Sequence, residues 1–346
     1  MTEAAHARAA APRTEAELED ALSRPTPSLA DTLARVPGDL IVLGAGGKMG
    51  PSLARMAKRA DPARRVIAAS RWSNTAAADA LAAAGVEIAR ADLLDPHALA
   101  ALPDASNVVF MAGQKFGTSG DPSVTWAMNA AVPAFVAERY AGARTVVFST
   151  GNVYPLTPVT QGGSRESDTL APVGEYAWSC LARERIFTAA ALRHRTPTAI
   201  VRLNYAHDLR YGVLTDLAAR ILTNDPISLT MGWVNVIWQG DANALALAAL
   251  AQASAPEPFV VNVAGPEVLK VADLAHALAT RLGRSAQLVG TEANDALLSD
   301  SARMRTLLGD PVLSLDTLLD WVADWTSRGG RLLGKPTKFE RRDGRF

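Results

Sequence analysis

A short apolar strand, a glycine-rich turn and an amphipathic helix follow one another near the start of the sequence. Residues 39–43 lead into the run Gly44-Ala45-Gly46-Gly47-Lys48-Met49-Gly50, and an amphipathic helical pattern follows from Pro51 to Ala60. Gly44 permits a tight turn, Gly47 lets the backbone approach a pyrophosphate, and Gly50 lets helix and strand pack closely. The helix amides face the anion. The run is therefore expected to bind a dinucleotide, with contacts from all of its residues except Ala45.

Further apolar runs alternate with helical patterns along the next hundred residues. The pattern predicts strands at 66–69, 86–91, 107–112 and 144–149, and helices near 96–102 and 123–139. Strands that alternate with helices pair in parallel, so we expect an α/β fold with a Rossmann-type doubly wound parallel sheet. Ligands bind beyond the carboxyl ends of such strands. The loops after residues 43, 70, 91, 112 and 149 are therefore expected to converge.

The pattern changes after Tyr205 to helices separated by short strands, which predicts a smaller α/β substrate lobe. Helices are expected near 211–222, 241–251, 271–282, 300–308 and 315–328, with strands near 227–230 and 259–263. We divide the chain into a helical extension (1–37), a dinucleotide-binding domain (38–204) and the lobe with a C-terminal tail (205–346), some segments of which return to the sheet. The extension is expected to carry helices at 14–23 and between Ser28 and Pro37. It packs on the main domain, or else serves as a lid or an oligomerisation arm. The tail from Arg331 docks on a neighbour or is a loose end.

Composition excludes several other classes of protein. Lys and Arg number 35, as do Asp and Glu, so the chain lacks the basic excess of a general nucleic-acid or membrane-surface binder. One cysteine excludes an intramolecular disulfide framework, and the five histidines show no metal-ligand spacing, so no metal is expected. No run of 18 apolar residues occurs, and the start is too acidic for a signal peptide. We expect a cytoplasmic protein.

The end of the second strand bears on the type of dinucleotide. NAD-binding folds usually place an acid there to hold the ribose 2′-hydroxyl, but this sequence has Ser70 and Arg71. An arginine beside a small hydroxyl residue suits a 2′-phosphate, and Lys48 adds a second cation. NADP is therefore favoured, with NAD as the alternative if both cations are merely solvated.

Several segments across residues 39–280 together resemble the extended short-chain dehydrogenases/reductases, in the NAD-dependent epimerase/dehydratase group. They are the glycine turn, the pair Asp92-Leu93, Asn129, the run Phe148-Ser149-Thr150-Gly151-Asn152-Val153-Tyr154, and Tyr176 followed by Ala177-Trp178-Ser179-Cys180. The resemblance implies that Asp92 and Leu93 contact adenine. Further expected cofactor contacts, after later strands, are Ala112, Gly113 and Asn204. Family members often pair through the helices of Asn129 and Tyr176, which implies a homodimer.

The resemblance also implies catalytic roles. A Ser or Thr at the position of Thr150 hydrogen-bonds the substrate oxygen, and a Tyr at the position of Tyr176 moves a proton, helped by a Lys one helical turn later. Cys180 stands at the lysine position. A thiol is only a weak neutral donor, whereas a cation lowers the pKa of a phenol from about 10. Arg183 or Lys115 could supply the charge, and we favour Lys115, which could instead bind a substrate carboxylate or phosphate. Cys180 itself is expected to be a buried filler.

Two further departures from the family pattern bear on the substrate. Dehydratases place an Asp-Glu pair after the Thr, where this chain has Gly151 and Asn152; nucleotide-sugar enzymes commonly place an Arg at the position of Val234. We therefore expect an NAD(P)-dependent oxidoreductase or epimerase of a small sugar-like carbonyl or hydroxyl compound, and not of a sugar nucleotide. The alternative is a catalytically impaired, cofactor-binding sensor or partner subunit. Side chains considered for substrate contact, besides Thr150, Tyr176 and Lys115, are Asn204, Arg210 and Trp238.

Overall fold

The computed structural model describes residues 10–115, 121–335 and 337–345, and its centre is a sheet of seven parallel strands. The strand order is β12-β7-β5-β4-β1-β2-β3. The strands are β1 (Leu40–Leu43), β2 (Val66–Ser70), β3 (Glu87–Arg90), β4 (Asn107–Phe110), β5 (Arg144–Thr150), β7 (Thr198–Leu203) and β12 (Phe259–Val263). The chain therefore forms the doubly wound Rossmann-type sheet that the sequence predicts, with β1 at the point where the strand order reverses.

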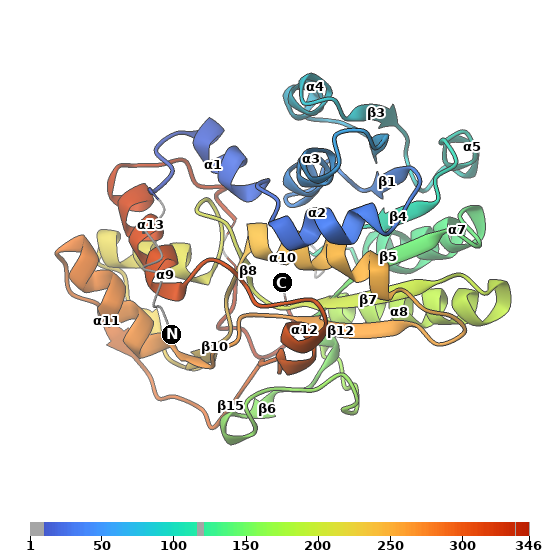
Figure 1. Cartoon of the computed structure of the whole chain (residues 1–346). Helices are drawn as coiled ribbons and strands as arrows, with labels where there is room; N and C mark the ends of the chain where they lie inside the picture. Colours follow the sequence, from blue (N-terminus) through green and yellow to red (C-terminus); the bar gives the residue numbers. More distant parts are fainter. Residues whose placement is uncertain (1–9, 116–120, 336, 346) are drawn as a thin grey trace, which may run out of the picture.

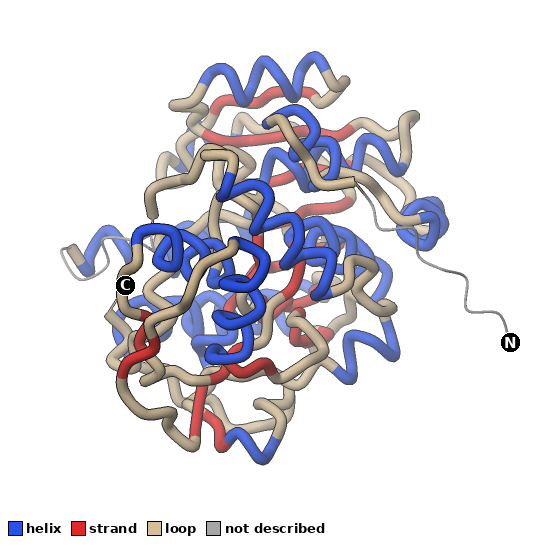
Figure 2. Tube along the Cα trace, turned by 90° about the vertical axis from the view of Figure 1, so that its left-hand side faces the viewer, coloured by secondary structure: helices blue, strands red, loops and turns tan. Residues whose placement is uncertain are grey.

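Helices cover both faces of this sheet. Every residue of β1 and β4 is buried, as expected of strands with helices on both sides. Val42 and Val109 pack against the helices of one face, whereas Val108 and Phe110 pack against those of the other. The first face carries α3 (Gly50–Ala60), α4 (Thr75–Ala83) and α10 (Gln239–Ala248), and the second carries α5 (Pro96–Ala100), α7 (Val132–Arg139) and α8 (Gly174–His194). Figure 2 shows the strands between these layers of helices.

The substrate lobe has its own hydrophobic core. Three helices pack together there, α9 (Val213–Thr223), α11 (Val271–Leu282) and α13 (Leu315–Ser327). In Figure 1 they lie on the left of the molecule, opposite the sheet. Outside the main sheet, short strands of two residues pair with one another. The pairs are β6 (Thr157–Pro158) with β15 (Asp295–Ala296), β8 (Ala206–His207) with β11 (Ile237–Trp238), β9 (Ile227–Ser228) with β14 (Leu288–Val289), and β10 (Trp233–Val234) with β13 (Leu269–Lys270).

The helical extension packs against both bodies. Thr14 Oγ1 accepts a hydrogen bond from the Glu17 amide at 3.2 Å and so caps α1 (Glu15–Leu22). Leu18 of α1 is buried in the lobe core, whereas Leu33 of α2 (Pro27–Ala34) is buried in the core beside the sheet. The extension thus joins the two bodies. Residues 1–9 of the predicted extension lie outside the described residues.

Two segments after the start of the lobe belong to the sheet and its cover. Strand β12 pairs in parallel with β7 at the edge of the sheet, and Met304 of α12 (Ala302–Leu307) is buried in the same core as α10. The lobe is therefore not continuous in sequence. The domain limits at residues 37 and 204 stay predictions.

The helix predicted at 123–139 contains a change of winding. It consists of α6 (Pro122–Trp126), a π-helical turn (Ala127–Ala131) and α7. Such turns occur frequently at functional sites. Here the π-turn carries Asn129, whose buried side chain faces the loop after β4 and helix α8. Hydrophobic periodicity cannot reveal this turn because the turn depends on those polar contacts.

Candidate functional site

A cavity of about 450 Å³ lies beyond the carboxyl ends of β1, β4, β5 and β7. Its lining includes Gly44 and Gly47–Gly50 after β1, Gly113 and Lys115 after β4, Ser149, Thr150 and Asn152 at the end of β5, Leu203–Ala206 after β7, and Tyr176 of α8. The loops after residues 43, 112 and 149 therefore converge as predicted. The loops after β2 and β3 lie outside this lining.

The glycine turn has no room for side chains at two of its positions. Gly44 has φ +86°, and a Cβ there would lie 2.6 Å from the backbone nitrogen of Ala112. A Cβ on Gly50 would lie 2.4 Å from the carbonyl oxygen of Ala45. Gly47, by contrast, is exposed and lines the cavity just before α3 begins. This bare backbone at a helix N-terminus fits the phosphates of a dinucleotide.

The two cations proposed for a 2′-phosphate do not lie together. Lys48 Nζ donates to the carbonyl oxygen of Ala206 at 3.3 Å and lies 4.5 Å from the ring centre of Tyr211. Arg71 is exposed, with Nη1 3.9 Å from Oδ2 of Asp92. The glycine turn directs Lys48 toward the loop after β7, so the expectation that Lys48 joins Arg71 is wrong. Burial lowers the pKa of Lys48 to about 8.

The candidate catalytic hydroxyl groups do meet. Thr150 ends β5, and its Oγ1 accepts a hydrogen bond from the Asn152 amide at 3.2 Å. Tyr176 lies in the first turn of α8 and lines the cavity together with Thr150, and the side chains of Thr150 and Cys180 both act on the pKa of its hydroxyl. Burial raises the pKa of Tyr176, and the positive charge of Arg183 opposes that rise. Burial also raises the pKa of Cys180. The phenol is therefore held in its protonated form.

Arg183 is buried, and its side chain hydrogen-bonds to other elements of the fold. Its guanidinium donates to the carbonyl oxygen of Phe148 at 2.7 Å and to Oδ1 of Asn129 at 2.8 Å. Asn129 Oδ1 also accepts from the amide of Gln114 at 2.8 Å, and its Nδ2 donates to Ser179 Oγ at 2.9 Å. These bonds fix α8, β5 and the loop that leads to Lys115 relative to one another.

Lys115 lies at the boundary between the sheet and the lobe. It lines the main cavity and a smaller cavity beside it. Burial lowers the pKa of Lys115 to about 8, and the charges of Cys180 on α8 and Asp216 on α9 act in the opposite direction. The ammonium group is thus within electrostatic range of the thiol that contacts Tyr176. Residues 116–120 of the same loop lie outside the described residues.

The remaining cofactor contacts predicted from the sequence take different places. Asn204 lines the cavity, and its Nδ2 donates to the carbonyl oxygen of Leu297 at 3.3 Å. Ala112 is buried against Gly44, next to the cavity-lining Gly113. The Oγ of Ser70 is directly opposite Gly46, where a Cβ would lie 2.6 Å from it.

The adenine-site pair and the two positional substrate candidates lie away from the main cavity. Asp92 Oδ1 accepts from the amide of Leu94, and Leu93 is buried. Trp238 packs edge-on against Trp321 at 5.5 Å in the lobe core. Arg210 is held by Asp208, Glu15 and Glu19. Trp238 and Arg210 are therefore packing and anchoring residues, and their assignment to the substrate is wrong.

Sequence reasoning missed the contribution of the C-terminal tail. Leu333, Lys335 and Thr337 line the main cavity, together with Tyr205 and Tyr211. The tail packs on its own chain and is not a loose end: Phe339 is buried in the lobe core. Basic residues and two phenylalanines mark the tail in the sequence, but its course over the lobe depends on tertiary contacts.

Neither a metal centre nor a membrane span is found in the part of the chain that the structure describes. No three or more His, Cys, Asp or Glu side chains there are grouped so as to hold a metal ion. None of the described helices has the length and apolar character needed to cross a bilayer.

The sheet, the bare glycine turn and the Thr150–Tyr176 pair define a dinucleotide-binding protein of the short-chain dehydrogenase/reductase type. Residues 40–264 match the model of the NAD dependent epimerase/dehydratase family, and the chain belongs to that family. The match confirms the family that the sequence motifs indicate. Comparison with curated proteins finds no match.

Solved structures share the fold at low sequence identity. The UDP-Glc/GlcNAc 4-epimerase from Campylobacter jejuni is 22% identical, with a TM-score of 0.71 over 84% of this chain and 99% of that one. The UDP-glucuronic acid 4-epimerase from Bacillus cereus in complex with NAD is 20% identical, with a TM-score of 0.70 over 84% and 97%. A short-chain dehydrogenase/reductase superfamily protein from Agrobacterium tumefaciens with bound NAD is 20% identical, with a TM-score of 0.69 over 84% of this chain and 97% of that one.

Two of these neighbours are UDP-sugar epimerases. That likeness argues against the expectation that a sugar nucleotide is not the substrate, which rests on Val234 alone. A single missing arginine does not decide the matter, because other side chains can bind a diphosphate.

Proposed function

We propose that this protein is an NAD(P)-dependent epimerase or oxidoreductase that acts on a secondary hydroxyl or carbonyl group of a sugar-type substrate, free or nucleotide-linked. The observation that carries the proposal is that Thr150 and Tyr176 line the same cavity as the glycine turn. A proton donor and a dinucleotide site in one cavity are the two requirements of hydride chemistry at a carbonyl.

The residues divide into holding and reacting groups. Backbone amides at residues 47–50 hold the pyrophosphate of the dinucleotide, whose nicotinamide ring supplies or accepts the hydride when bound. The hydroxyl of Thr150 orients the substrate oxygen, and Tyr176 gives a proton to that oxygen or takes one from it. Burial raises the pKa of Tyr176, so the phenol is supplied protonated, and the reverse direction needs a nearby cation to stabilise the phenolate.

We assign that cation to Lys115. Its ammonium group acts electrostatically on Cys180, which in turn acts on the hydroxyl of Tyr176. The guanidinium of Arg183 also lowers the pKa of Tyr176, but it is committed to Phe148 and Asn129. Lys115 comes from the loop after β4, whereas Arg183 lies on α8 itself. This arrangement would make Cys180 compatible with catalysis, against the alternative of an impaired sensor.

The preferred coenzyme is proposed to be NADP. Arg71 directly follows β2 and has an exposed guanidinium, close to the position where an acid would hold the ribose 2′-hydroxyl of NAD. Lys48 is directed elsewhere, so Arg71 alone carries the preference. NAD, which is bound in related structures, is the alternative.

We also propose a homodimer formed through α6, α7 and α8. These helices expose several large apolar side chains, which are Val124, Trp126, Phe135, Trp178 and Leu192. Helices α7 and α8 pack side by side, and Trp126 Nε1 of α6 donates to Glu175 of α8 at 2.6 Å. Apolar patches of this kind mark interaction sites.

Coenzyme titration followed by a substrate screen tests the proposed function. NAD and NADP are titrated by calorimetry, and sugars, sugar acids and UDP-sugars are then followed by nicotinamide absorbance and by NMR for isomer exchange. Wild type is expected to bind a dinucleotide and convert at least one substrate, and Tyr176→Phe to bind equally but turn over at least a hundredfold more slowly. Absence of dinucleotide binding would overturn the proposal. Tight binding without any turnover would favour the sensor.

A further inference from the structure

Residues 206–212, which comprise β8 and the turn before α9, form a wall of the main cavity. Ala206, Tyr211 and Gly212 line that cavity together with the glycine turn. Lys48 of the glycine turn contacts this segment at two points, through its hydrogen bond to the carbonyl oxygen of Ala206 and through the ring of Tyr211. A dinucleotide whose phosphates lie against residues 47–50 would therefore lie beside the 206–212 segment.

The 206–212 segment is a closed turn with a buried ion pair. The amides of Asp208 and Tyr211 each donate to the carbonyl oxygen of the other residue at 2.9 Å. Nη2 of Arg210 donates to Oδ2 of Asp208 at 2.8 Å, where the Asp208 side chain is fully buried and that of Arg210 is 11% exposed. Because these bonds lie within the segment, we expect it to move as one unit.

Helix α1 of the extension holds this unit from outside the cavity. Arg210 Nη1 pairs with Oε2 of Glu15 at 3.0 Å and with Oε1 of Glu19 at 2.7 Å. Glu15 and Glu19 lie four residues apart on α1, so both carboxylates can reach the same guanidinium. Leu18 of α1 is also buried in the lobe core that contains Leu209. The segment is thus fixed to α1 by both ionic and apolar contacts.

Helix α1 is tied to the dinucleotide-binding domain as well. Nη1 of Arg59, in the last turn of α3, pairs with Oδ1 of Asp20 at 2.9 Å and donates to Oγ of Ser23 at 3.0 Å. Helix α3 begins at Gly50 of the glycine turn. Figure 1 shows α1 between α3 and the helices of the lobe. The extension therefore connects the domain that carries the glycine turn with the 206–212 segment of the same cavity.

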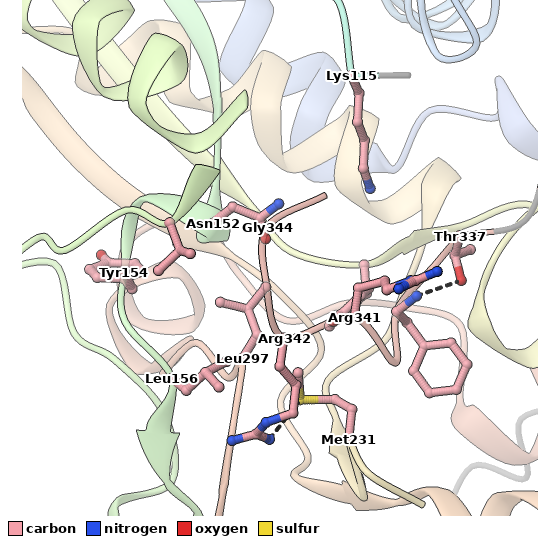
Figure 3. A pocket seen from close by; sticks show the side chains of 13 residues that line it. Lys115, Asn152, Tyr154, Leu156, Met231, Leu297, Thr337, Arg341, Arg342 and Gly344 are labelled. Carbon is pink, nitrogen blue, oxygen red and sulfur yellow. Dashed lines mark hydrogen bonds between the residues drawn. The ribbon is translucent and has the colours of Figure 1, made fainter. Parts of the chain in front are cut away.

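The C-terminal tail also holds the 206–212 segment. The amide of Leu333 donates to the carbonyl oxygen of Arg210 at 3.0 Å. The amide and hydroxyl of Thr337 donate to Oδ2 of Asp216 on α9 at 2.8 and 2.6 Å. Figure 3 shows the tail beside the smaller cavity, from Thr337 to Gly344.

Further along, the tail meets the helix that carries Tyr176. A Cβ on Gly344 would lie 2.2 Å from the carbonyl oxygen of Val173, and one on Gly174 would lie 2.5 Å from the carbonyl oxygen of Gly344. Both glycines have positive φ, 69° and 82°. The tail is therefore anchored on the lobe and at the start of α8, and it presents the Leu333 amide to Arg210 from a fixed position.

We infer that the 206–212 segment is a lid over the bound coenzyme and that Glu15 and Glu19, acting through Arg210, control how fast the coenzyme leaves. This inference rests on the dinucleotide site of the proposed function. The coenzyme leaves when the segment moves away from the glycine turn, and that movement breaks the ion pairs of Arg210 with α1. Glu15 and Glu19 lie outside the cavity lining, so they are positioning residues.

The strength of these contacts suits such a role. Hydrogen bonds between ionised groups are stronger than neutral ones, and Arg210 is nearly buried, so its pairs are less screened than ordinary surface pairs. Glu15 and Glu19 are 40% and 31% exposed. Their contacts with Arg210 can therefore break and re-form without exposing the lobe core.

The test measures coenzyme dissociation from the full-length protein. Binding of NADH and NADPH is first established by calorimetry, and the bound coenzyme is then displaced in a stopped-flow instrument while nicotinamide fluorescence is followed. The double variant Glu15→Ala/Glu19→Ala is expected to raise the dissociation rate constant about tenfold, because two charge-assisted hydrogen bonds no longer oppose opening. Glu17→Ala is the matched control. Glu17 lies on the same helix, but its carboxylate accepts from the Arg13 amide at 2.6 Å, so the rate should equal that of wild type.

A second measurement separates the lid from a general loss of stability. Alanine is a good helix former, so α1 should persist, and the melting temperature without coenzyme checks this. If the double variant melts at a lower temperature, Glu19→Gln makes the same comparison, since it keeps the shape of the side chain and removes one charge. Its dissociation rate constant is expected to rise about threefold.

Two results would overturn the inference while leaving the proposed function intact. One is a dissociation rate that is unchanged in both the double variant and Glu19→Gln, and the other is an equal acceleration in Glu17→Ala. If wild type binds neither dinucleotide in the calorimeter, the proposed function fails, and this inference fails with it.

Discussion

Cys180 stands one helical turn after Tyr176, where the family resemblance implies a lysine, and Lys115 comes within electrostatic range of Cys180 from the β4 loop. We expect Lys115→Ala to lower kcat at least tenfold, because the phenolate loses the cation that we assign to it. Cys180→Lys should restore much of that loss in the double variant. Lys338→Ala, on the C-terminal tail but outside the cavity linings, is the control. A raised KM with unchanged kcat in Lys115→Ala, and no rescue by Cys180→Lys, would restrict Lys115 to substrate binding.

The protonation of Lys115 predicts a pH dependence. Burial lowers its pKa from 10.5 to about 8, and Cys180, Asp216, Lys48, Lys335 and Arg341 are the titratable or charged groups around it. Affinity for an anionic probe is therefore expected to fall as the pH rises through about 8, because the ammonium charge is lost. The profile in Lys115→Ala should be flatter. A profile identical to wild type would assign the titration to Lys48, whose pKa is also lowered to about 8.

The lowered pKa of Lys115 also predicts how the stability of the fold depends on pH. A lysine whose pKa is lower in the folded chain than in the unfolded chain is charged at a cost near neutral pH, and this cost falls as the pH rises from about 8 toward 10.5. Lys115→Met is therefore expected to raise the free energy of unfolding more at pH 7 than at pH 10. Urea denaturation at the two pH values measures this. A larger gain at pH 10 would contradict the burial argument.

Arg71 is predicted to set the coenzyme preference. Removing its exposed guanidinium in Arg71→Ala should weaken NADP binding about tenfold and leave NAD binding unchanged, since only NADP carries the 2′-phosphate. Arg193→Ala removes another exposed, carboxylate-paired arginine near the far end of α8, and serves as control. Equal effects on both dinucleotides would remove the assignment.

At the scale of elements, the glycine turn offers two substitutions with opposite expectations. Gly50→Ala places a methyl group 2.4 Å from the Ala45 carbonyl oxygen, so the turn must shift, and a loss of about 1–3 kcal/mol in the free energy of unfolding is expected. Gly47→Ala meets only an ordinary contact of 3.4 Å. The variant should keep the melting temperature of the wild type yet bind the dinucleotide more weakly, because its methyl group projects into the cavity where the backbone would approach the phosphates. Calorimetric melting and coenzyme titration separate the two effects.

Elements built by periodic burial could be predicted from the sequence, whereas elements built by polar contacts could not. Strands such as β1 and β5, and helices such as α11, follow hydrophobic patterns that lie within their own short segments of sequence. The π-turn at Asn129 depends on partners in Gln114, Ser179 and Arg183, which lie far away in sequence. The loops after three strands could be placed at the site because the carboxyl ends of parallel strands lie at the same edge of the sheet.

The side chains of the site were harder to assign than its loops. Thr150 and Tyr176 follow from the motif, but Lys48 turns toward Ala206, and Trp238 toward the lobe core. The course of the C-terminal tail could not be predicted, because it is fixed by Asp216, Asp295 and the core around Phe339. No local pattern specifies contacts of that kind.

At the scale of the whole molecule, the exposed face of α6, α7 and α8 predicts a dimer. Trp178 is 52% exposed and Leu192 67% exposed, on one face of α8. We expect Trp178→Glu to shift the protein from dimer to monomer in size-exclusion chromatography with light scattering, since a charge would be buried at the contact. Val312→Glu changes a side chain that is 62% exposed elsewhere and should have no effect. A wild-type monomer would refute the interface.

The contact between Gly174 and Gly344 is made by backbone atoms alone, at the point where the C-terminal tail reaches α8. A single added methyl group at Gly344 would keep the two segments apart and widen the entrance to the reaction chamber. Bulkier molecules would then gain access, and the variant should be less discriminating without any change to the residues that perform the chemistry.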